Sequence, residues 1–164
     1  EAVEPPPLEQ ALHALLHSQP IAALGTLRAT AEGDEPFVSM VPVAWWPGTA
    51  EALIHVSSLS PHTRDLLADP RVSLLLVAPR VAGDNPLALP RLSVQCLAEP
   101  LSRGSTAWAE AQAAYGARFP EAEQTFVLGD FSLVRLQPRS ARFVAGFGRA
   151  HGLTAAGLVQ ALSG

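Results

Sequence analysis

The sequence has one cysteine, Cys96, so no disulfide can form within the chain. Disulfides are rare in reducing compartments, and a single cysteine therefore fits a cytoplasmic protein. No apolar run approaches the roughly 18 residues that cross a bilayer, so we expect no membrane partner. Residues 1–7 are acidic and proline-rich, without the cationic start and apolar run of a secretion signal, and we expect them to be disordered.

Charged residues are also scarce: they make up 16% of the chain, against about 25% in typical soluble domains. The net charge is −4 at pH 7 and no basic block exists, which argues against nucleic-acid binding. Hydrophobic residues make up 48% of the chain. Two interpretations of this composition stand side by side: part of the surface is buried in an oligomer, or the chain simply favours alanine, leucine and proline.

Familiar catalytic motifs are absent as well. The sequence has no Gly-x-Ser-x-Gly nucleophile elbow and no Walker phosphate-binding loop. His13 and His17 lie four residues apart, but no third ligand of matching spacing follows, so a zinc site is not predicted. We interpret Cys96, on the apolar side of an expected strand, as core filler rather than a nucleophile. A protein without obvious catalytic acids or bases can still support a reaction if it binds a cofactor that supplies the chemistry.

The 164 residues are enough for one domain, which we place at residues 1–164. Apolar residues at helical spacing predict helices, and alternating runs between turn residues predict strands. We expect helices at residues 8–19, 61–69, 105–119 and 154–162, and strands at residues 21–28, 36–46, 52–56, 71–78, 91–99, 131–136 and 141–145. This succession predicts a mainly β (α+β) fold, an antiparallel barrel of six or seven strands with short flanking helices.

Several local expectations accompany this fold. Residues 71–78 are almost all apolar, so we expect both faces of that strand to be buried. Pro42 indicates a sheet edge or a bulge, and Pro138 is expected to break the strand around it. Residues 79–90 form a loop that is long enough to be a functional loop or an extended arm. The glycine-rich residues 146–152 are expected to be mobile.

The most informative stretch is residues 55–70. It is typical of a strand end, a polar loop and a two-turn helix, with Ser60 at the N-cap and Pro61 at the first helical position. The open backbone N–H groups of such a helix start, the nearby hydroxyls, His62 and Arg64 outline a site for a phosphate. An ordinary capped helix with a solvated first turn is the alternative.

The order of these segments resembles a known family. The strand sequences Ala-Leu-Gly-Thr-Leu and Pro-Phe-Val-Ser-Met-Val-Pro precede Ile-His-Val-Ser-Ser-Leu-Ser-Pro-His-Thr-Arg-Asp-Leu and Asp-Pro-Arg-Val-Ser-Leu-Leu. Together they resemble the FMN-binding split barrels of the pyridoxamine 5′-phosphate oxidase type. The Ser-x-His-Thr-Arg-x-Leu-x-x-Asp-Pro-Arg-Val core and residues 143–150 look most like the haem-utilisation branch. The resemblance covers about residues 8–153.

The resemblance implies a split barrel that forms a homodimer, with FMN sites at the interface and a small-molecule substrate. In this family the second strand runs along the flavin ring, and the loop before the short helix holds the phosphate. A residue at the start of the fifth strand reaches the flavin from the partner, and C-terminal residues close over the ring. The implied cofactor-binding residues are Ser39, Met40, Val41, His55, Ser57, Ser60, His62, Thr63, Arg64, Arg91, Gln95, Phe147 and Arg149.

Haem is the alternative cofactor, because some relatives bind it through a C-terminal histidine. His151 is then the candidate ligand, and an ordinary surface histidine is the other interpretation. The chain departs from the oxidase proper: Pro61-His62 replaces its basic pair, and the uncharged Ser39 replaces a basic residue. We also expect neither its C-terminal Arg-rich motif nor the additional C-terminal domain of haem-utilisation proteins, so pyridoxamine phosphate oxidation is not predicted.

Three hypotheses follow from these observations. The first is an FMN-dependent oxidoreductase of unknown substrate, in which the flavin supplies the redox chemistry. The second is a haem-binding or haem-utilisation protein, or a flavin carrier or sensor, without turnover. The third is a structural or regulatory barrel that has lost its ligand.

Overall fold

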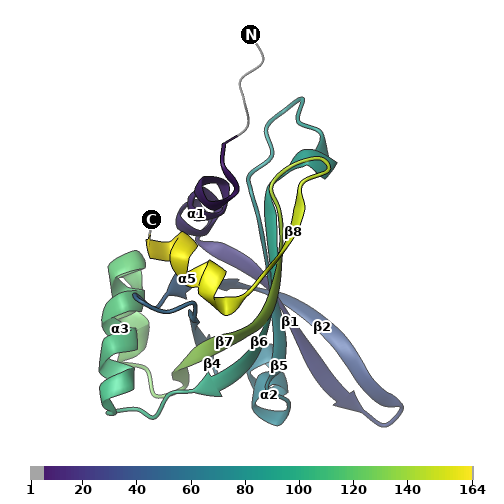
Figure 1. The fold of residues 1–164 in the computed structure, drawn as a ribbon. Helices are drawn as coiled ribbons and strands as arrows, with labels where there is room; N and C mark the ends of the chain where they lie inside the picture. Colours follow the sequence, from purple (N-terminus) through teal and green to yellow (C-terminus); the bar gives the residue numbers. More distant parts are fainter. Residues whose placement is uncertain (1–5, 164) are drawn as a thin grey trace.

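The computed structural model of the chain describes residues 6–163 (Figure 1). Disorder is expected for residues 1–7. Of these, residues 1–5 lie outside the described residues, and Pro6 and Pro7 lie within them. The strands are β1 (Ile21–Thr30), β2 (Gly33–Pro42), β3 (Ala44–Trp45), β4 (Ala52–Ser57), β5 (Arg71–Val77), β6 (Arg91–Pro100), β7 (Phe131–Val144) and β8 (Ala150–Leu153). The helices are α1 (Leu8–Ser18), α2 (Pro61–Ala68), α3 (Thr106–Arg118), α4 (Glu123–Phe126) and α5 (Ala155–Ser163), with 3-10 turns at Pro86–Ala88 and Pro120–Ala122.

The predicted mainly β, antiparallel architecture is confirmed. The strands form one sheet in the order β2-β1-β5-β6-β7-β4-β3, and β8 pairs with β7 outside this path. Figure 1 shows the sheet curving strongly, with α1 and α5 packed together beside it and α3 flanking β4. The β1–β2 hairpin projects beyond the other strands, and β2 is an edge strand that ends at Pro42, as predicted.

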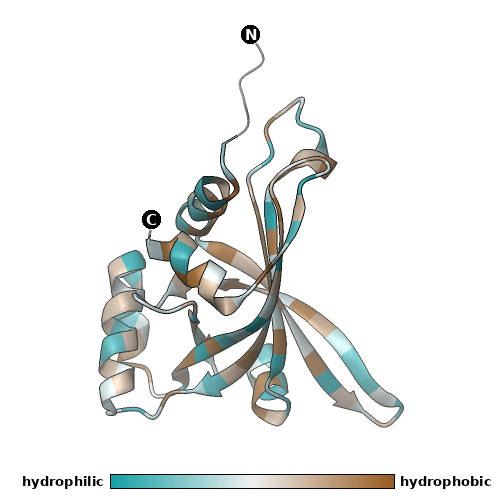
Figure 2. Cartoon of the chain, in the orientation of Figure 1, coloured by the Kyte–Doolittle hydropathy of each residue, from teal (hydrophilic) through white to brown (hydrophobic). Residues whose placement is uncertain are grey.

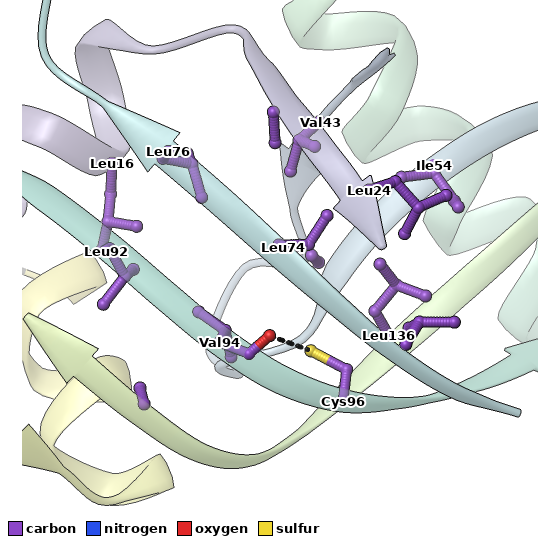
Figure 3. Packing of buried hydrophobic residues seen from close by; sticks show 14 of the residues in the cluster. Leu16, Leu24, Val43, Ile54, Leu74, Leu76, Leu92, Val94, Cys96 and Leu136 are labelled. Carbon is purple, nitrogen blue, oxygen red and sulfur yellow. Dashed lines mark hydrogen bonds between the residues drawn. The ribbon is translucent and has the colours of Figure 1, made fainter. Parts of the chain in front are cut away.

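The main core fills the inside of the curved sheet (Figure 3). Alternate residues of the strands point inward, because successive side chains of a strand face opposite sides. The α1 helix closes this core with the stripe Leu12, Leu15 and Leu16, which the sequence pattern predicts. Cys96 is buried in the same core and its thiol lies 3.9 Å from the Val94 carbonyl oxygen. Burial raises the pKa of this thiol to about 12, in keeping with a core side chain.

A second, smaller core lies on the opposite face of β4 and β7, under α3 and α4. Its members are Ala44, Leu53, Leu101, Trp108, Ala111, Tyr115, Ala122, Phe126 and Leu133. The Ser105 hydroxyl caps α3 by accepting a hydrogen bond from the Trp108 N–H at 3.1 Å. Because β4 carries apolar residues on both faces, it is buried between the two cores.

Strand β5 differs from its prediction. Its residues alternate strictly between exposed and buried, so only one face is covered. Leu75 and Val77 are 39% and 37% exposed on the other face. The expectation that both faces are buried is wrong for the single chain, because no element among residues 6–163 covers the outer face of β5.

The C-terminal strands also differ from their predictions. Pro138 does not break β7: it lies opposite Cys96, where the register shifts and Arg139 is left without an opposite residue. A bulge of this kind tolerates a residue that lacks an N–H. The glycine-rich residues 146–152, expected to be mobile, form a tight turn and then β8, so the sheet has eight strands rather than six or seven. Gly148 takes a positive φ of 73° in this turn, which glycine adopts without strain.

Within residues 6–163, no helix is both long enough and apolar enough to cross a membrane.

Candidate functional site

The start of α2 lies where the sequence predicts it, with Ser60 at the N-cap and Pro61 at the first helical position. The Ser60 hydroxyl makes no capping hydrogen bond, however. The Thr63 N–H instead donates to the Ser60 main-chain carbonyl, at 3.1 Å. The first turn of α2 is therefore closed by the backbone rather than by a side chain.

Two of the hydroxyl groups around the start of α2, those of Ser57 and Thr63, are hydrogen-bonded within the protein. Thr63 is buried, and its hydroxyl donates to the Ser57 carbonyl at 2.6 Å. The Ser57 hydroxyl donates to the Asp130 carboxylate at 2.8 Å and accepts the Leu59 N–H at 3.1 Å. The Ser58 N–H donates to the Asp130 carbonyl at 2.7 Å. The loop is thus tied to the segment before β7, and the Asp130 carboxylate binds one of the predicted phosphate ligands, Ser57.

His62 links α2 to the neighbouring strand β2. Its Nδ1 lies 2.9 Å from the Ser39 hydroxyl, so two of the predicted site residues bind each other. Burial lowers the pKa of His62 below its usual value, and the nearby Asp65 opposes this shift. The imidazole is therefore mainly neutral at pH 7 and adds no full positive charge to the loop.

Asp65 anchors α2 to β1 through a buried network. The Arg28 guanidinium donates to both carboxylate oxygens, at 3.2 and 3.1 Å, and the Thr26 hydroxyl donates at 3.1 Å. Arg28 also lies over the Phe37 ring, 4.0 Å from its centroid. The hydrogen bonds from Arg28 lower the pKa of Asp65, so the carboxylate stays charged and paired. Sequence analysis missed this network, because its members come from three different elements.

The residues around α2 offer little positive charge to the dianionic phosphate of FMN. Of the predicted phosphate ligands only Arg64 is a permanent cation, and it is exposed in a shallow pocket beside Arg28 and Asp65. His62 is neutral, and the Ser57 and Thr63 hydroxyls donate to protein acceptors. A phosphate needs several convergent donors and positive charge, and the carboxylate of Asp130 works against it.

His55 does not lie with the other predicted ligands, because it points into the second core. Its ring lies 4.5 Å from that of Phe126 and 5.0 Å from that of Phe131. The Thr125 hydroxyl gives its proton to the Ala122 carbonyl at 2.8 Å, so it accepts from His55 Nδ1 at 3.2 Å. The other ring nitrogen, Nε2, is buried and has no partner among the described residues. Burial and the positive Arg103 lower the pKa of His55 to about 4.

A second candidate region is the outer face of the sheet, which the strand register defines. Residues opposite one another in a sheet share a face. One row runs Met40–Ala23–Leu75–Ser93–Arg142–Gly152, and the next runs Val38–Gly25–Ser73–Gln95–Ser140. Figure 2 shows apolar residues alternating with polar ones along the β1–β2 hairpin.

This outer face is divided by chemistry. On β1, β2 and β5 it carries exposed apolar side chains, which we call the apolar half: Ile21, Val38, Met40, Leu75 and Val77. On β6, on β7 and in the turn between β7 and β8 it carries arginines. A pocket of about 370 Å³ lies there, lined by Arg91, Arg142, Arg149, Phe147 and neighbouring small residues of the β7–β8 turn. We call this pocket the arginine groove.

The arginines of the groove lack carboxylate partners within residues 6–163. Arg91 is oriented by hydrogen bonds from its Nη1 to the Leu87 and Leu89 carbonyls, at 3.2 and 3.0 Å. Arg149 donates to the Pro6 carbonyl at 3.1 Å. The loop 79–90, which we singled out for its length, therefore holds one side of the groove through Leu87.

The structure thus separates the thirteen predicted ligands into groups. Ser39, Ser57, Ser60, His62, Thr63 and Arg64 lie around the start of α2; Met40 and Gln95 lie on the outer face; Arg91, Phe147 and Arg149 lie in the groove; Val41 and His55 lie in the two cores. Arg142 was missed, although its position next to the apolar Phe143 in a strand already indicates that it points outward. His151 lies opposite Phe143, so it is on the face of β8 away from the groove.

Comparison with known proteins gives a consistent result. A family model described as pyridoxamine 5′-phosphate oxidase matches residues 8–145. A protein named heme oxygenase HutZ, from Vibrio cholerae, is 33% identical over 106 residues, which cover 64% of this chain and 60% of that protein. A protein of Arabidopsis thaliana named non-canonical heme oxygenase HOZ, chloroplastic, is 31% identical over 140 residues, which cover 85% of this chain and 40% of that protein.

Among solved structures, a heme binding protein from Mycobacterium smegmatis superposes with a TM-score of 0.80 and 30% identity, over 96% of this chain and 62% of that one. The chain therefore spans less than two thirds of the length of each of these relatives. The resemblance to the haem-utilisation branch is confirmed by these matches. Since the family model covers most of the chain and the antiparallel sheet agrees with it, the chain belongs to the pyridoxamine 5′-phosphate oxidase family.

Proposed function

We propose that this chain binds haem on the outer face of its sheet, as part of a haem-utilisation protein. The observation that carries this proposal is the division of that face into an apolar half and an arginine groove. Haem has the same division, because its flat ring is apolar and its two propionates lie together at one edge. The names of the relatives, two heme oxygenases and a heme binding protein, support the same ligand.

FMN is less well supported than haem. Both cofactors have a flat ring and a negative end, but FMN concentrates its two charges on one phosphate. At the start of α2, where the family resemblance places that phosphate, the Ser57 and Thr63 hydroxyls donate to protein acceptors and the Asp130 carboxylate lies beside Ser57. The haem alternative therefore takes precedence over an FMN-dependent oxidoreductase.

We further propose that the apolar half of the outer face contacts a second copy of the chain. Met40 and Val38 are 61% and 66% exposed, and monomeric proteins rarely leave such side chains together in one patch. A two-fold dimer buries one patch against itself, which needs no other partner. The arginine groove adjoins this patch along the strand rows, so the ligand would lie at the edge of the interface.

The test is a titration of the purified protein with haemin, followed by the Soret absorbance. We expect a saturable spectral change at one haem per chain. In a parallel titration FMN should keep its fluorescence and leave the melting temperature of the protein unchanged. Saturable quenching of FMN without any haemin response would overturn the proposal in favour of a flavoprotein. Adding ascorbate in air to the haem complex then separates turnover from storage, because degradation removes the Soret band.

A further inference from the structure

We propose that Arg142 and Arg149 form a clamp for two carboxylate groups of a flat ligand, beside the already expected Arg91. This inference rests on the proposed function and deepens it: it assigns the residues that grip the haem propionates and so fix how the ring lies on the outer face. The basis is the position of these side chains, the positive charge that they gather in one pocket, and the open space around them.

The first argument is position. Arg142 lies opposite Ser93 of β6, and the same row continues through Leu75 and Ala23 to Met40. Arg149 is in the turn that follows β7, where its carbonyl accepts the Ala145 N–H at 2.8 Å and its N–H donates to the Gly146 carbonyl at 3.1 Å. Both side chains line the same groove. A ligand held there would extend its ring toward the apolar half.

The second argument is charge. Among the described residues, Arg28, Arg71 and Arg135 are each paired with a carboxylate, whereas Arg64, Arg80, Arg103, Arg118 and Arg139 are not; what sets the groove apart is that three arginines without such a partner gather in one pocket. The groove arginines have no such partner among the described residues, and the chain as a whole is acidic, with a net charge of −4. Three arginines gathered in one pocket repel one another unless an anion joins them. Arginine suits a carboxylate, because its planar fork can donate two parallel hydrogen bonds.

The third argument is access. Gly152 lies opposite Arg142 on β8, and a Cβ atom built there would meet nothing within 4 Å. The same holds for Gly148 beside Arg149. Gly148 lines the groove and leaves open space beside Arg149, and Gly152 leaves the outer face open opposite Arg142, so a carboxylate can approach both arginines. Phe147 is 75% exposed at the rim and offers a flat apolar surface to the adjoining ring.

These features favour a ligand with two carboxylates on an apolar body over a lone phosphate or a nucleotide. The groove holds about 370 Å³, which is within the usual range for ligand sites of roughly 300–1,000 Å³ but too little to enclose a whole tetrapyrrole. It fits the carboxylate edge of such a molecule, while the ring projects over the neighbouring strands.

The experiment compares haemin with haemin dimethyl ester, in which both carboxylates are blocked. Binding of each is measured by absorbance titration to the wild type, Arg142→Ala, Arg149→Ala and the double variant. Arg80→Ala, which removes an exposed arginine in the loop 79–90, is the matched control. We expect each single groove variant to weaken haemin binding about 10-fold, since a hydrogen bond to a charged group contributes roughly that factor. Binding of the ester should be weak in the wild type and unchanged in the variants.

The outcomes separate this inference from the proposed function. If the wild type binds haemin but both groove variants bind it equally well, or if haemin and ester weaken by the same factor, the clamp is overturned and haem binding stands. If the wild type binds no haemin, both proposals fall. The melting temperature of each variant checks that it folds, and Arg142→Gln repeats the measurement with a side chain closer in size.

Discussion

The surroundings of the His55 side chain make the stability of the folded chain depend on pH. Its pKa lies at about 4 in the folded chain, because burial disfavours the charged ring and Arg103 adds repulsion, against 6.5 for an ordinary histidine. The unfolded chain therefore binds the proton more tightly. The contribution of His55 to stability is complete above pH 6.5 and is lost progressively as the pH falls toward 4.

We predict that His55→Phe makes the free energy of unfolding depend less on pH between pH 6.5 and 4. The wild type should lose up to about 3 kcal/mol between pH 6.5 and 4 through this one group, since one pKa unit corresponds to about 1.4 kcal/mol. The variant keeps the aromatic packing with Phe126 and Phe131 and removes the unpartnered Nε2. Urea unfolding at several pH values measures the difference. His151→Phe, which changes an exposed histidine, is the control, and an equal flattening there would contradict the assignment to His55.

At the scale of elements, α2 is held against β1 chiefly by one carboxylate. Asp65→Asn removes the charge that both Arg28 hydrogen bonds depend on. We predict a loss of about 2–3 kcal/mol in the free energy of unfolding at pH 7, the range for buried hydrogen bonds to charged groups. Because the pKa of Asp65 is lowered, the difference from the wild type is complete above the unfolded pKa, near 3.8, and disappears as the pH falls through the lower folded value.

The control for this prediction is Asp69→Asn, which weakens the other Asp–Arg pair next to α2. Asp69 pairs with Arg71 at the surface, where solvent screens the charges and such pairs add little stability. Denaturant unfolding of both variants should therefore give clearly different losses. Equal losses would mean that the Arg28–Asp65 network does not fix the helix.

The elements that the sequence predicts well are those with local signals. α1, α2 and α3 begin or end at prolines and serines whose effect on the backbone does not depend on the rest of the fold. Strand β8 was missed because four residues carry too little periodicity, and its pairing with β7 forms only in the folded chain. Pro138 was misinterpreted because the bulge that accommodates it belongs to the pair β6–β7, not to one strand.

The candidate site was predictable only in part, for the same reason. The face on which Arg142 lies follows from alternation with Phe143, but its approach to Arg149 depends on the turn between β7 and β8. The His55 side chain points toward α3 and α4, which cover that side of β4. No local sequence pattern predicts this packing. The hydrogen bond from the Ser57 hydroxyl to the Asp130 carboxylate joins segments that are far apart in the chain, so the sequence alone could not predict it.

At the scale of the whole molecule, the apolar half of the outer face makes a prediction about assembly. We expect the wild type to be a dimer at micromolar concentration, with twice the mass of one chain by analytical ultracentrifugation. Leu75→Arg should yield monomers, because it puts a charge in the middle of the row from Met40 to Arg142. Leu67→Arg, at a more exposed apolar position on α2, should stay dimeric. A monomeric wild type, or a dimeric Leu75→Arg, would show that this face does not bind a second copy.

The position of β4 has a consequence for how the chain is made. β4 is synthesised early, but its neighbour in the sheet is β7, and Ala52 lies opposite Leu136. Both of its faces are apolar, and the helix that covers one of them, α3, also comes later in the chain. While the chain emerges from the ribosome, the backbone groups along one edge of β4 therefore stay unpaired until β7 has been synthesised. Translation pauses within residues 58–130 should prolong that exposure and increase aggregation of the nascent chain.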